Sequence, residues 1–324
     1  ALDIPAISLT GPQVGIMVEP VHGKGRILKI DLTRLEQELA SCDVVAVAGF
    51  QGVDVHGDIV TLGRGGSDTS AVAVAAALKA DVCEILTDVD GVYSTDPRIV
   101  PEASKMEKIS YDEMLEMASL GSKVLQLRSV EFAKKYDVVV HVRSSLNDNP
   151  GTLVTKEDAD METVLVSGIA YNKDEAKIAV MRVPDKPGVA AQLFSPLSTA
   201  NIMVDMIIQN VSHEGFTDLT FTVPRGDFKR AKKIVEETAA KIGAAGVQTN
   251  ESIAKVSIIG VGMRSHSGIA SKMFATLSAE GVNIQMISTS EIKVSCVIDD
   301  KYTELAVRVL HEAFDLDKDQ VAEE

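Results

Sequence analysis

Two short polar segments hold the side chains best suited to chemistry. The first is a glycine-rich turn at 63–66, followed by Ser67, Asp68 and an alanine-rich helical pattern. Glycine lets the backbone approach a ligand closely, and the free N–H groups at a helix N-terminus favour an anion. Arg64 lies in the same turn, and its planar guanidinium suits a carboxylate or a phosphate. The turn therefore predicts an anion site, with Ser67, Asp68 and Thr69 able to cap a helix that begins near Thr69.

The second segment follows an apolar run at 83–86 that predicts a strand. The end of this strand delivers Thr87, Asp88 and Asp90 into an acidic loop. In open α/β sheets, ligands bind outside the C-terminal ends of the strands. A glycine turn alone is usually only a turn, and an acidic loop alone is usually solvated. Together the two segments indicate one site for an anionic substrate and a nucleotide.

Composition restricts the possible functions of this chain. With 324 residues, 45% of them hydrophobic and 24% charged, we expect two or three globular domains. The net charge of −15 argues against binding to nucleic acid, which needs clustered Lys and Arg. No apolar run is long enough for a membrane span and no signal-peptide pattern begins the sequence, so we expect a cytoplasmic protein. Cys42, Cys83 and Cys296 are widely spaced and are interpreted as reduced core thiols, with no metal site.

The elements that must position these side chains alternate in type up to about residue 154. Apolar runs predict strands, amphipathic patterns predict helices, and the alternation predicts layers of helices around a largely parallel sheet. The expected strands are 44–48, 83–86 and 138–142, and the expected helices are 32–41, 69–80, 111–118 and 123–135.

The remaining residues contain an internal repeat. Segment 185–207 aligns without a gap with segment 265–287, so that Gly188 matches Gly268 and Ile207 matches Ile287, always 80 positions apart. A strand precedes each copy, at 177–182 and 255–260, and the order β-α-β-β-α-β is the ferredoxin-like arrangement. Such units can simply pack against each other, or they can bind ligands at the helix start.

Five segments together closely resemble the aspartate kinase (aspartokinase) family. The resemblance runs almost end to end and implies an α/β fold. It comprises an amino-acid-kinase-type αβα sandwich over 1–154, lacking its first portion, followed by two ferredoxin-like ACT domains at 167–245 and 251–320. The matching segments are VVAVAGFQGVD (44–54), TLGRGGSDTS (61–70), EILTDVDGVYSTDPR (84–98), EMLEMASLGSKVLQLRSVEFA (113–133) and MISTSEIKVS (286–295).

The resemblance implies transfer of the γ-phosphoryl group of ATP to the β-carboxylate of L-aspartate. The product is 4-phospho-L-aspartate, and the reaction opens the biosynthesis of lysine, threonine and methionine. Arg64 would hold a carboxylate of aspartate, Ser67 would add a hydrogen bond, and Asp68 would orient the catalytic groups. Mg²⁺ would bridge phosphate oxygens, for which we name no protein ligand. The residues that match the family's ATP-binding positions are Thr87, Asp88, Tyr93, Arg98 and Lys123.

The two ACT domains imply feedback inhibition by lysine and threonine, the family's usual effectors, and assembly into homo- or hetero-oligomers. A ligand carboxylate would bind the free N–H groups at a helix start, and polar side chains on the following strand would hold an ammonium or hydroxyl group. The expected effector-binding residues are Asp185, Gly188, Val189, Ala190, Asp205, Gln209, Asn210, Asn283, Ile284 and Ser290.

The sequence departs from the family at one motif. The Lys-x-Gly-Gly-Thr-Ser turn, whose lysine neutralises the transferred phosphoryl group, is not found in these 324 residues. We therefore expect the chain as given to be inactive alone.

Two other functions fit the sequence less well. A non-catalytic, amino-acid-binding regulatory subunit would not need the GRGGSD and TDVDGVYSTDPR segments, which are both present. A kinase acting on glutamate or acetylglutamate is disfavoured by the duplicated ACT tail and by the GRGGSDT motif.

Overall fold

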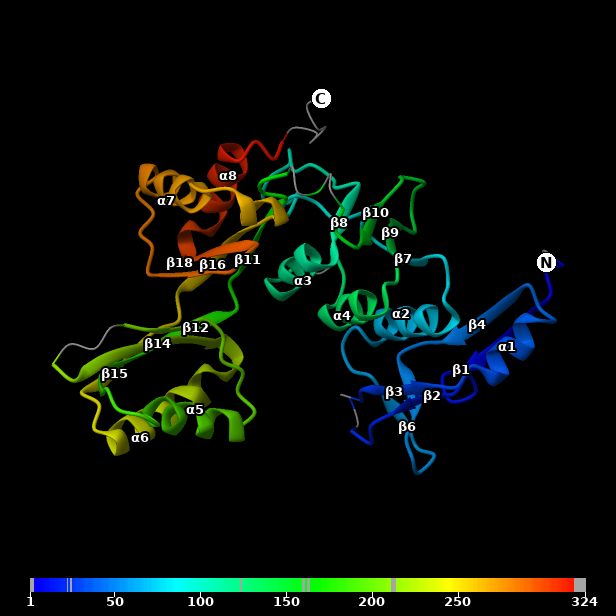
Figure 1. The fold of residues 1–324 in the computed structure, drawn as a ribbon, viewed down its shortest axis with the longest axis horizontal. Helices are drawn as coiled ribbons and strands as arrows, with labels where there is room; N and C mark the ends of the chain where they lie inside the picture. The colour runs from blue at the N-terminus through cyan, green and yellow to red at the C-terminus, as the bar shows by residue number, and fades with distance from the viewer. Residues whose placement is uncertain are drawn as a thin grey trace. The chain divides into compact units, whose positions relative to one another are not determined.

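The computed structural model describes residues 3–21, 23, 25–122, 124–158, 161, 164–210 and 214–317. The chain forms two compact units. Of the described residues, the first contains those up to 96 and those within 103–167, and the second contains those within 97–102 and 168–317. Figure 1 follows the chain through both units from the N-terminus (blue) to the C-terminus (red).

The strands of the first unit lie in three sheets, so the prediction of one largely parallel sheet is wrong. β4, from the first predicted strand, and β7, from the second, belong to different sheets. Apolar side chains on them remain exposed, at 46% for Val44 and 60% for Leu86. A run of apolar residues indicates that a strand can be buried, but it does not choose the neighbouring strand.

The three sheets of the first unit differ in their pairing. β1 (Ala6–Thr10) pairs with β4 (Val44–Ala48) in parallel. The second sheet has the order β3-β2-β5-β6, with β2 (Ile16–Val18), β3 (Ile27–Ile30), β5 (Gln51–Val53) and β6 (Ile59–Thr61). The third has the order β7-β9-β10-β8, with β7 (Cys83–Thr87), β8 (Lys108–Ser110), β9 (Val140–Ser144) and β10 (Thr152–Thr155).

The four helices predicted for the first unit are present. α2 packs against α4 and α4 against α3, which places the polar turns before α2 and α4 beside each other. The last helix was expected from residue 123 but begins at Leu127. Lys123 lies outside the described residues. The helices are α1 (Thr33–Leu39), α2 (Gly66–Leu78), α3 (Tyr111–Ser119) and α4 (Leu127–Tyr136).

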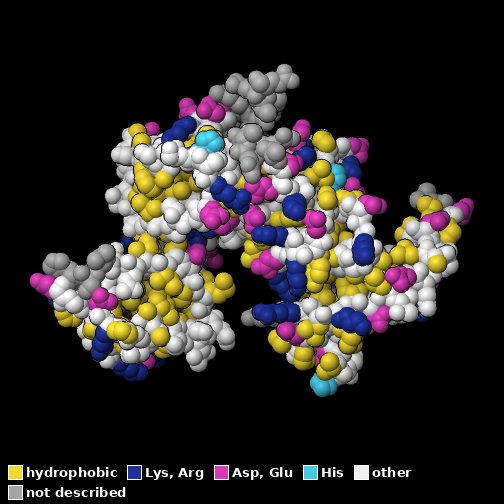
Figure 2. All heavy atoms as spheres, in the orientation of Figure 1, with side chains coloured by type: hydrophobic (Ala, Val, Ile, Leu, Met, Phe, Trp, Pro, Cys, Tyr) yellow, Lys and Arg dark blue, Asp and Glu magenta, His cyan; other side chains and the backbone are white. Residues whose placement is uncertain are grey.

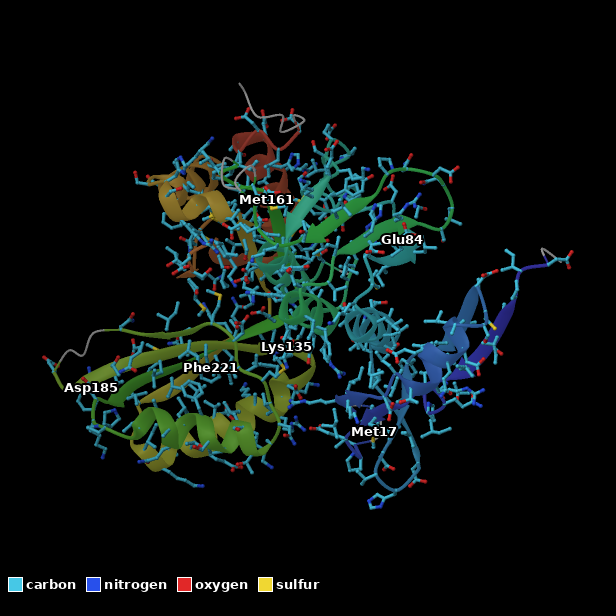
Figure 3. The ribbon with its side chains drawn as sticks, turned by 45° about the vertical axis from the view of Figure 1, so that its right-hand side comes forward. Met17, Glu84, Lys135, Met161, Asp185 and Phe221 are labelled. Carbon is cyan, nitrogen blue, oxygen red and sulfur yellow. The ribbon has the colours of Figure 1, made fainter. Side chains whose placement is uncertain are left out.

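The second unit contains one complete ferredoxin-like unit over residues 175–250, called here the first repeat. Its sheet has the order β13-β14-β12-β15, and α5 and α6 cover one face (Figure 1). The core between sheet and helices contains Phe221, which is fully buried and labelled in Figure 3. The elements are β12 (Glu175–Pro184), α5 (Val189–Thr199), β13 (Ile207–Gln209), β14 (Phe216–Pro224), α6 (Phe228–Ile242) and β15 (Gly246–Asn250), with a 3-10 turn η2 (Arg225–Asp227).

The second repeat takes its fourth strand from before the first repeat. Its sheet has the order β11-β16-β18-β17, and β11 (Gly168–Asn172) pairs antiparallel with β16. The sequence-based division grouped this strand with the first ACT domain. The sequence pattern of a strand does not determine which of two similar sheets the strand joins. The other elements are β16 (Ile253–Ile259), η3 (Val261–Ser265), α7 (Ile269–Ala279), β17 (Met286–Thr289), β18 (Lys293–Asp299), η4 (Asp300–Tyr302) and α8 (Thr303–Ala313).

None of the helices in the described part of the chain combines the length and the apolar character needed to span a membrane.

Candidate active site and effector pocket

The glycine-rich turn between β6 and α2 has a backbone that only glycine adopts easily. Gly63 (φ 81°) and Gly65 (φ 70°) are in the left-handed region. A Cβ at Gly65 would lie 1.9 Å from Cγ of Gln126, so the turn packs directly against the segment before α4. This contact joins two parts of the sequence that are about sixty positions apart, at one edge of the candidate site.

The start of α2 differs from the capping arrangement expected from the sequence. The helix begins at Gly66, its N-cap is Gly65, and no side chain caps it. The hydroxyl of Thr69 instead donates to the carbonyl of Gly65 (2.9 Å), one turn back. Ser67 and Asp68 therefore lie inside the first turn and are not used as caps.

The Asp68 carboxylate is half-buried against the segment before α4. Burial raises its pKa above the ordinary aspartate value, and a hydrogen bond from the backbone N–H of Gln126 partly opposes this rise. Arg64 and Ser67, by contrast, are exposed. Within the described part of the chain, Arg64 makes no ion pair, so its guanidinium is available to a ligand. The turn thus presents one cation, one hydroxyl and one carboxylate held in place.

Arg128 is a positioning residue that the sequence reasoning missed. Its guanidinium donates to the carbonyls of Leu62 (2.7 Å) and Gly25 (2.9 Å), which fixes α4 to the start of the glycine turn. A basic residue in the first turn of a helix is electrostatically unfavourable, and this was the available sequence signal for another role. Figure 2 shows lysine and arginine side chains gathered over α2 and α4 on the visible face.

The acidic loop after β7 is held by hydrogen bonds to a second segment, 145–152. The carbonyl of Thr87 accepts from the backbone N–H (2.8 Å) and the hydroxyl (3.0 Å) of Ser145. The carboxylate of Asp90 accepts from the Tyr93 hydroxyl (2.8 Å) and from the Asn149 amide (2.7 Å). Asp90 therefore shapes the loop, while Asp88 stays exposed. Asn149 belongs to no sequence pattern that could reveal this role.

These contacts explain the shifted pKa values of Asp90 and Tyr93. The hydrogen bond from Asn149 is the largest cause of the lowered pKa of Asp90. Burial, and then the hydrogen bond to Asp90, raises the pKa of Tyr93 to about 12. The loop is therefore held by an ionised carboxylate and a neutral phenol at neutral pH.

The contacts of the described residues bring the expected site residues together in two groups. Asp68 accepts a hydrogen bond from the backbone N–H of Gln126. Thr87 is joined to 145–152 through Ser145, and Tyr93 is joined to it through Asp90 and Asn149. Arg98 falls in the segment 97–102, which groups with the second unit. Lys123 is not described.

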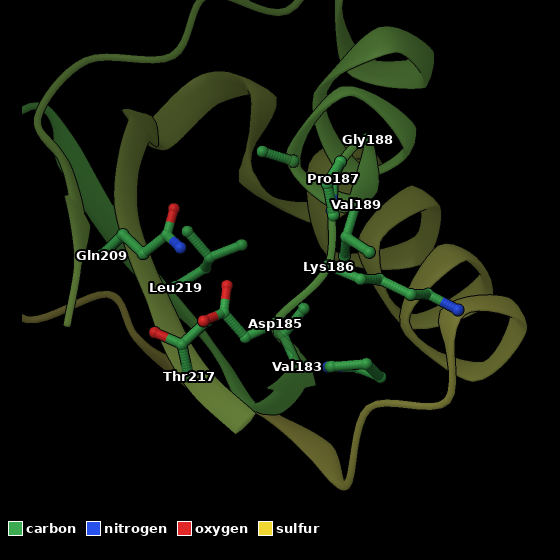
Figure 4. Close-up of a pocket in the computed structure, with 11 residues that line it drawn as sticks. Val183, Asp185, Lys186, Pro187, Gly188, Val189, Gln209, Thr217 and Leu219 are labelled. Carbon is green, nitrogen blue, oxygen red and sulfur yellow. The ribbon is translucent and has the colours of Figure 1, made fainter. Parts of the chain in front are cut away.

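A pocket of about 500 Å³ opens at the end of the first repeat where α5 begins. Its lining includes the turn before the helix on one side and strand residues on the other, and Figure 4 shows the Asp185 carboxylate and the Gln209 amide on the sheet side. Gly188, the N-cap of α5, has φ 89° and open space where a Cβ would lie. Five residues expected to bind effectors line this pocket: Asp185, Gly188, Val189, Ala190 and Gln209.

The other expected effector residues lie elsewhere. Asp205 pairs with Lys255 of the second repeat. Asn210 lines a different pocket, because neighbouring residues of a strand point to opposite faces and Gln209 points to the first one. In the second repeat, Asn283 and Ile284 precede β17 and Ser290 follows it.

Comparisons with known proteins agree with this architecture. The Amino acid kinase family matches residues 1–144, and two ACT domain families match residues 177–243 and 256–314. An aspartate kinase of Pseudomonas putida is 60% identical over 315 residues, covering 97% of this chain and 77% of the relative. The aspartokinase of Corynebacterium glutamicum is 47% identical, covering 98% of this chain and 76% of the relative.

Solved structures give the same assignment. The aspartate kinase of Clostridium acetobutylicum superimposes with a TM-score of 0.81 at 26% identity, covering 94% of this chain and 70% of that one. E. coli aspartokinase III in complex with aspartate and ADP gives a TM-score of 0.77 at 28% identity, covering 96% and 70%. The same enzyme with lysine and aspartate gives 0.74 at 27% identity, with the same coverage. By sequence over nearly its whole length and by fold, the chain belongs to the aspartate kinase family.

Proposed function

We propose that the chain transfers the γ-phosphoryl group of ATP to the β-carboxylate of L-aspartate, giving 4-phospho-L-aspartate. The observation that carries the proposal is the turn before α2, where an exposed arginine without an ion pair among the described residues stands beside Ser67 and a fixed Asp68. The E. coli relative solved with aspartate and ADP supports the pairing of these two ligands.

Phosphoryl transfer of this type depends on positioning and charge neutralisation. Arg64 holds a carboxylate of aspartate through its planar fork. Asp68, fixed by the N–H of Gln126, orients cationic groups near the transferred phosphoryl. Thr87, Asp88, Tyr93, Arg98 and Lys123 bind the nucleotide, and the Asp90–Tyr93 hydrogen bond keeps the loop ready for it. Mg²⁺ carried by the ATP phosphates would neutralise part of their charge, and we name no protein ligand for it.

We further propose that the pocket before α5 binds the effectors lysine and threonine. The E. coli relative solved with lysine supports an amino-acid effector. Free N–H groups at the start of α5 receive the carboxylate of the effector, and the Asp185 carboxylate and Gln209 amide receive its ammonium group. The reaction takes place in the cytoplasm and is a step in the biosynthesis of lysine, threonine and methionine. The ACT repeats join chains into oligomers.

The kinase proposal is tested by following ADP formation with ATP, Mg²⁺ and L-aspartate, while hydroxylamine traps the acyl phosphate. Hydroxamate that forms only when aspartate is present supports the proposal. Aspartate-independent ADP formation, with no hydroxamate from the full-length protein, would contradict it. Running the assay on the 324-residue polypeptide and on a longer chain with the lysine-glycine turn tests the expectation that these residues alone are inactive.

The effector proposal has its own measurement. Calorimetric titration with lysine, threonine and their mixture should show binding that Asp185→Asn weakens at least tenfold. Heat signals absent for all three solutions would exclude these effectors.

A further inference from the structure

A second pocket, of about 320 Å³, lies on the face of the first repeat's sheet that α5 and α6 do not cover. The alternation of strand residues defines this face, because Ile178 and Phe221 point into the helical core while their neighbours Lys177 and Thr220 line the pocket. Gln285 of the second repeat closes one side. The pocket is therefore separate from the one at the start of α5.

The two repeats share a strand register that identifies equivalent residues. In the first repeat, Phe221 is the cross-strand partner of both Ile178 and Ile207. In the second repeat, Cys296 is the cross-strand partner of both Val256 and Ile287. Lys177 directly precedes Ile178, and Lys255 directly precedes Val256, so these two lysines occupy equivalent positions.

The same register makes Asp205 and Gln285 equivalent. Asp205 lies two residues before Ile207, and Gln285 lies two residues before Ile287. Each donates its backbone N–H to a carbonyl of the neighbouring strand, at Thr222 (2.9 Å) and Val297 (2.8 Å). The two lysines reach across reciprocally: Lys255 contacts Asp205 of the first repeat, and Lys177 contacts Gln285 of the second.

The reciprocal contacts differ in charge. The Lys255 ammonium is buried and neutralised by two carboxylates, Glu175 (2.5 Å) and Asp205. The Lys177 ammonium bonds directly to a neutral oxygen, Oε1 of Gln285 (2.5 Å), and the Gln285 amide nitrogen donates to Asp299 (2.6 Å). No carboxylate of the described residues bonds to Lys177 itself. Gln285 thus supplies a neutral amide at the position where its equivalent, Asp205, supplies a carboxylate.

This difference leaves a partly desolvated cation in the wall of a pocket. Burial lowers the pKa of Lys177, and only the more distant Asp299 opposes the shift. A cation withdrawn from water is costly until an anion pairs with it. The remaining polar residues of the lining are all neutral: Thr220, Thr249, Asn210, Gln248 and Asn250.

We propose that this pocket binds a small monocarboxylate with a further hydrogen-bonding group, its carboxylate paired with the Lys177 ammonium. One cation among neutral donors and acceptors matches a single negative charge. A phosphate dianion would leave one charge unmatched. The amides and the hydroxyl receive the polar substituent of the ligand. The site is independent of the effector pocket and of the kinase reaction.

The test is lysine footprinting on the full-length protein. Trace acetylation followed by peptide mass spectrometry measures the reactivity of each amine with L-lactate, L-serine or inorganic phosphate present. We expect lactate or serine to reduce acetylation of Lys177 at least threefold while exposed Lys229 is unchanged. The two probes distinguish a hydroxy acid from an amino acid. Protection by phosphate alone, or no protection by either carboxylate, overturns the proposal.

Two variants locate the binding. Lys177→Gln should weaken binding of the protecting probe at least tenfold, measured by saturation-transfer NMR. The double variant Gln285→Glu with Asp299→Asn keeps the net charge but moves the carboxylate onto Lys177, and should weaken binding equally. Gln209→Ala, which alters only the effector pocket, should leave it unchanged. Circular dichroism confirms that each variant is folded, and unchanged affinity in both charge variants would refute the site.

Discussion

At the scale of single residues, Arg64 is the side chain whose removal should affect chemistry without affecting the fold. It is exposed and makes no ion pair with the described residues. A hydrogen-bonded charge contributes about 1.5–3 kcal/mol, so in the full-length protein Arg64→Gln should lower kcat/KM for aspartate by about 10- to 100-fold. The melting temperature should stay the same. Arg308→Gln, an exposed helical arginine of the second repeat, is the control. Equal loss in both variants would contradict the role.

The pair of Asp90 and Tyr93 makes a prediction about pH. The lowered pKa of Asp90 means that its stabilisation exists above the unfolded aspartate pKa and is lost as pH falls through the folded value. The pKa of Tyr93, raised to about 12, means that its contribution is complete below about pH 10 and is lost as pH rises through 12. The loop should therefore be most stable between these limits.

The measurement is the absorbance of tyrosinate. Asp90→Asn should bring the titration of Tyr93 below 12, toward the free value, because its charge no longer opposes ionisation. Tyr93→Phe identifies the signal among the five tyrosines. Tyr111, whose pKa is also raised to about 12, mainly by burial, should titrate unchanged in both variants. A high-pH absorbance change that keeps its full amplitude in Tyr93→Phe would refute the assignment, because only the Tyr111 contribution should remain.

At the scale of elements, the glycines that begin α2 and α5 form a matched pair. Gly65 and Gly188 are both left-handed N-caps, but a Cβ would clash only at Gly65, with Gln126. Gly188→Ala should cost about 1–2 kcal/mol from backbone strain alone. Gly65→Ala adds overpacking of typically 1–3 kcal/mol.

Urea denaturation of the two alanine variants measures this difference in the free energy of unfolding. Gly65→Ala should also raise the KM for aspartate, because the turn carrying Arg64 must move. Equal destabilisation by the two substitutions would show that the contact with Gln126 does not constrain the turn.

At the scale of the whole molecule, the origin of β11 links sequence-distant parts of the second unit. Ile169 on β11 is 1% exposed. Its replacement by alanine should cost about 2–5 kcal/mol. The loss of stability should appear in the second repeat, over 253–313, although Ile169 precedes the first repeat in sequence. Ile178→Ala, in the core of the first repeat, is the reverse control.

Amide hydrogen exchange in the full-length protein separates the two outcomes. Ile169→Ala should reduce protection of β16 and β18 while β12 and β14 remain protected, and Ile178→Ala should do the opposite. Loss of protection confined to 175–250 in the Ile169 variant would mean that β11 stabilises the first repeat instead.

The sequence by itself determined the local elements and the family. Strands 44–48 and 83–86, the helix after the glycine turn and the repeat were predictable, because hydrophobic periodicity and glycine positions act over a few residues. Gly188 and Gly268, which the repeat aligns, are both left-handed in the structure, with φ 89° and 93°. The residues matching the family supplied the candidate site.

Tertiary structure alone decided which elements meet. The assignment of β4 and β7 to different sheets, the pairing of β11 with β16, and the contacts of Arg128 and Asn149 depend on partners far away in sequence. The same holds for Gln209 and Asn210, adjacent residues that line different pockets. Pairing and side-chain contact depend on the free energy of the assembled neighbours, and a local pattern does not contain that information.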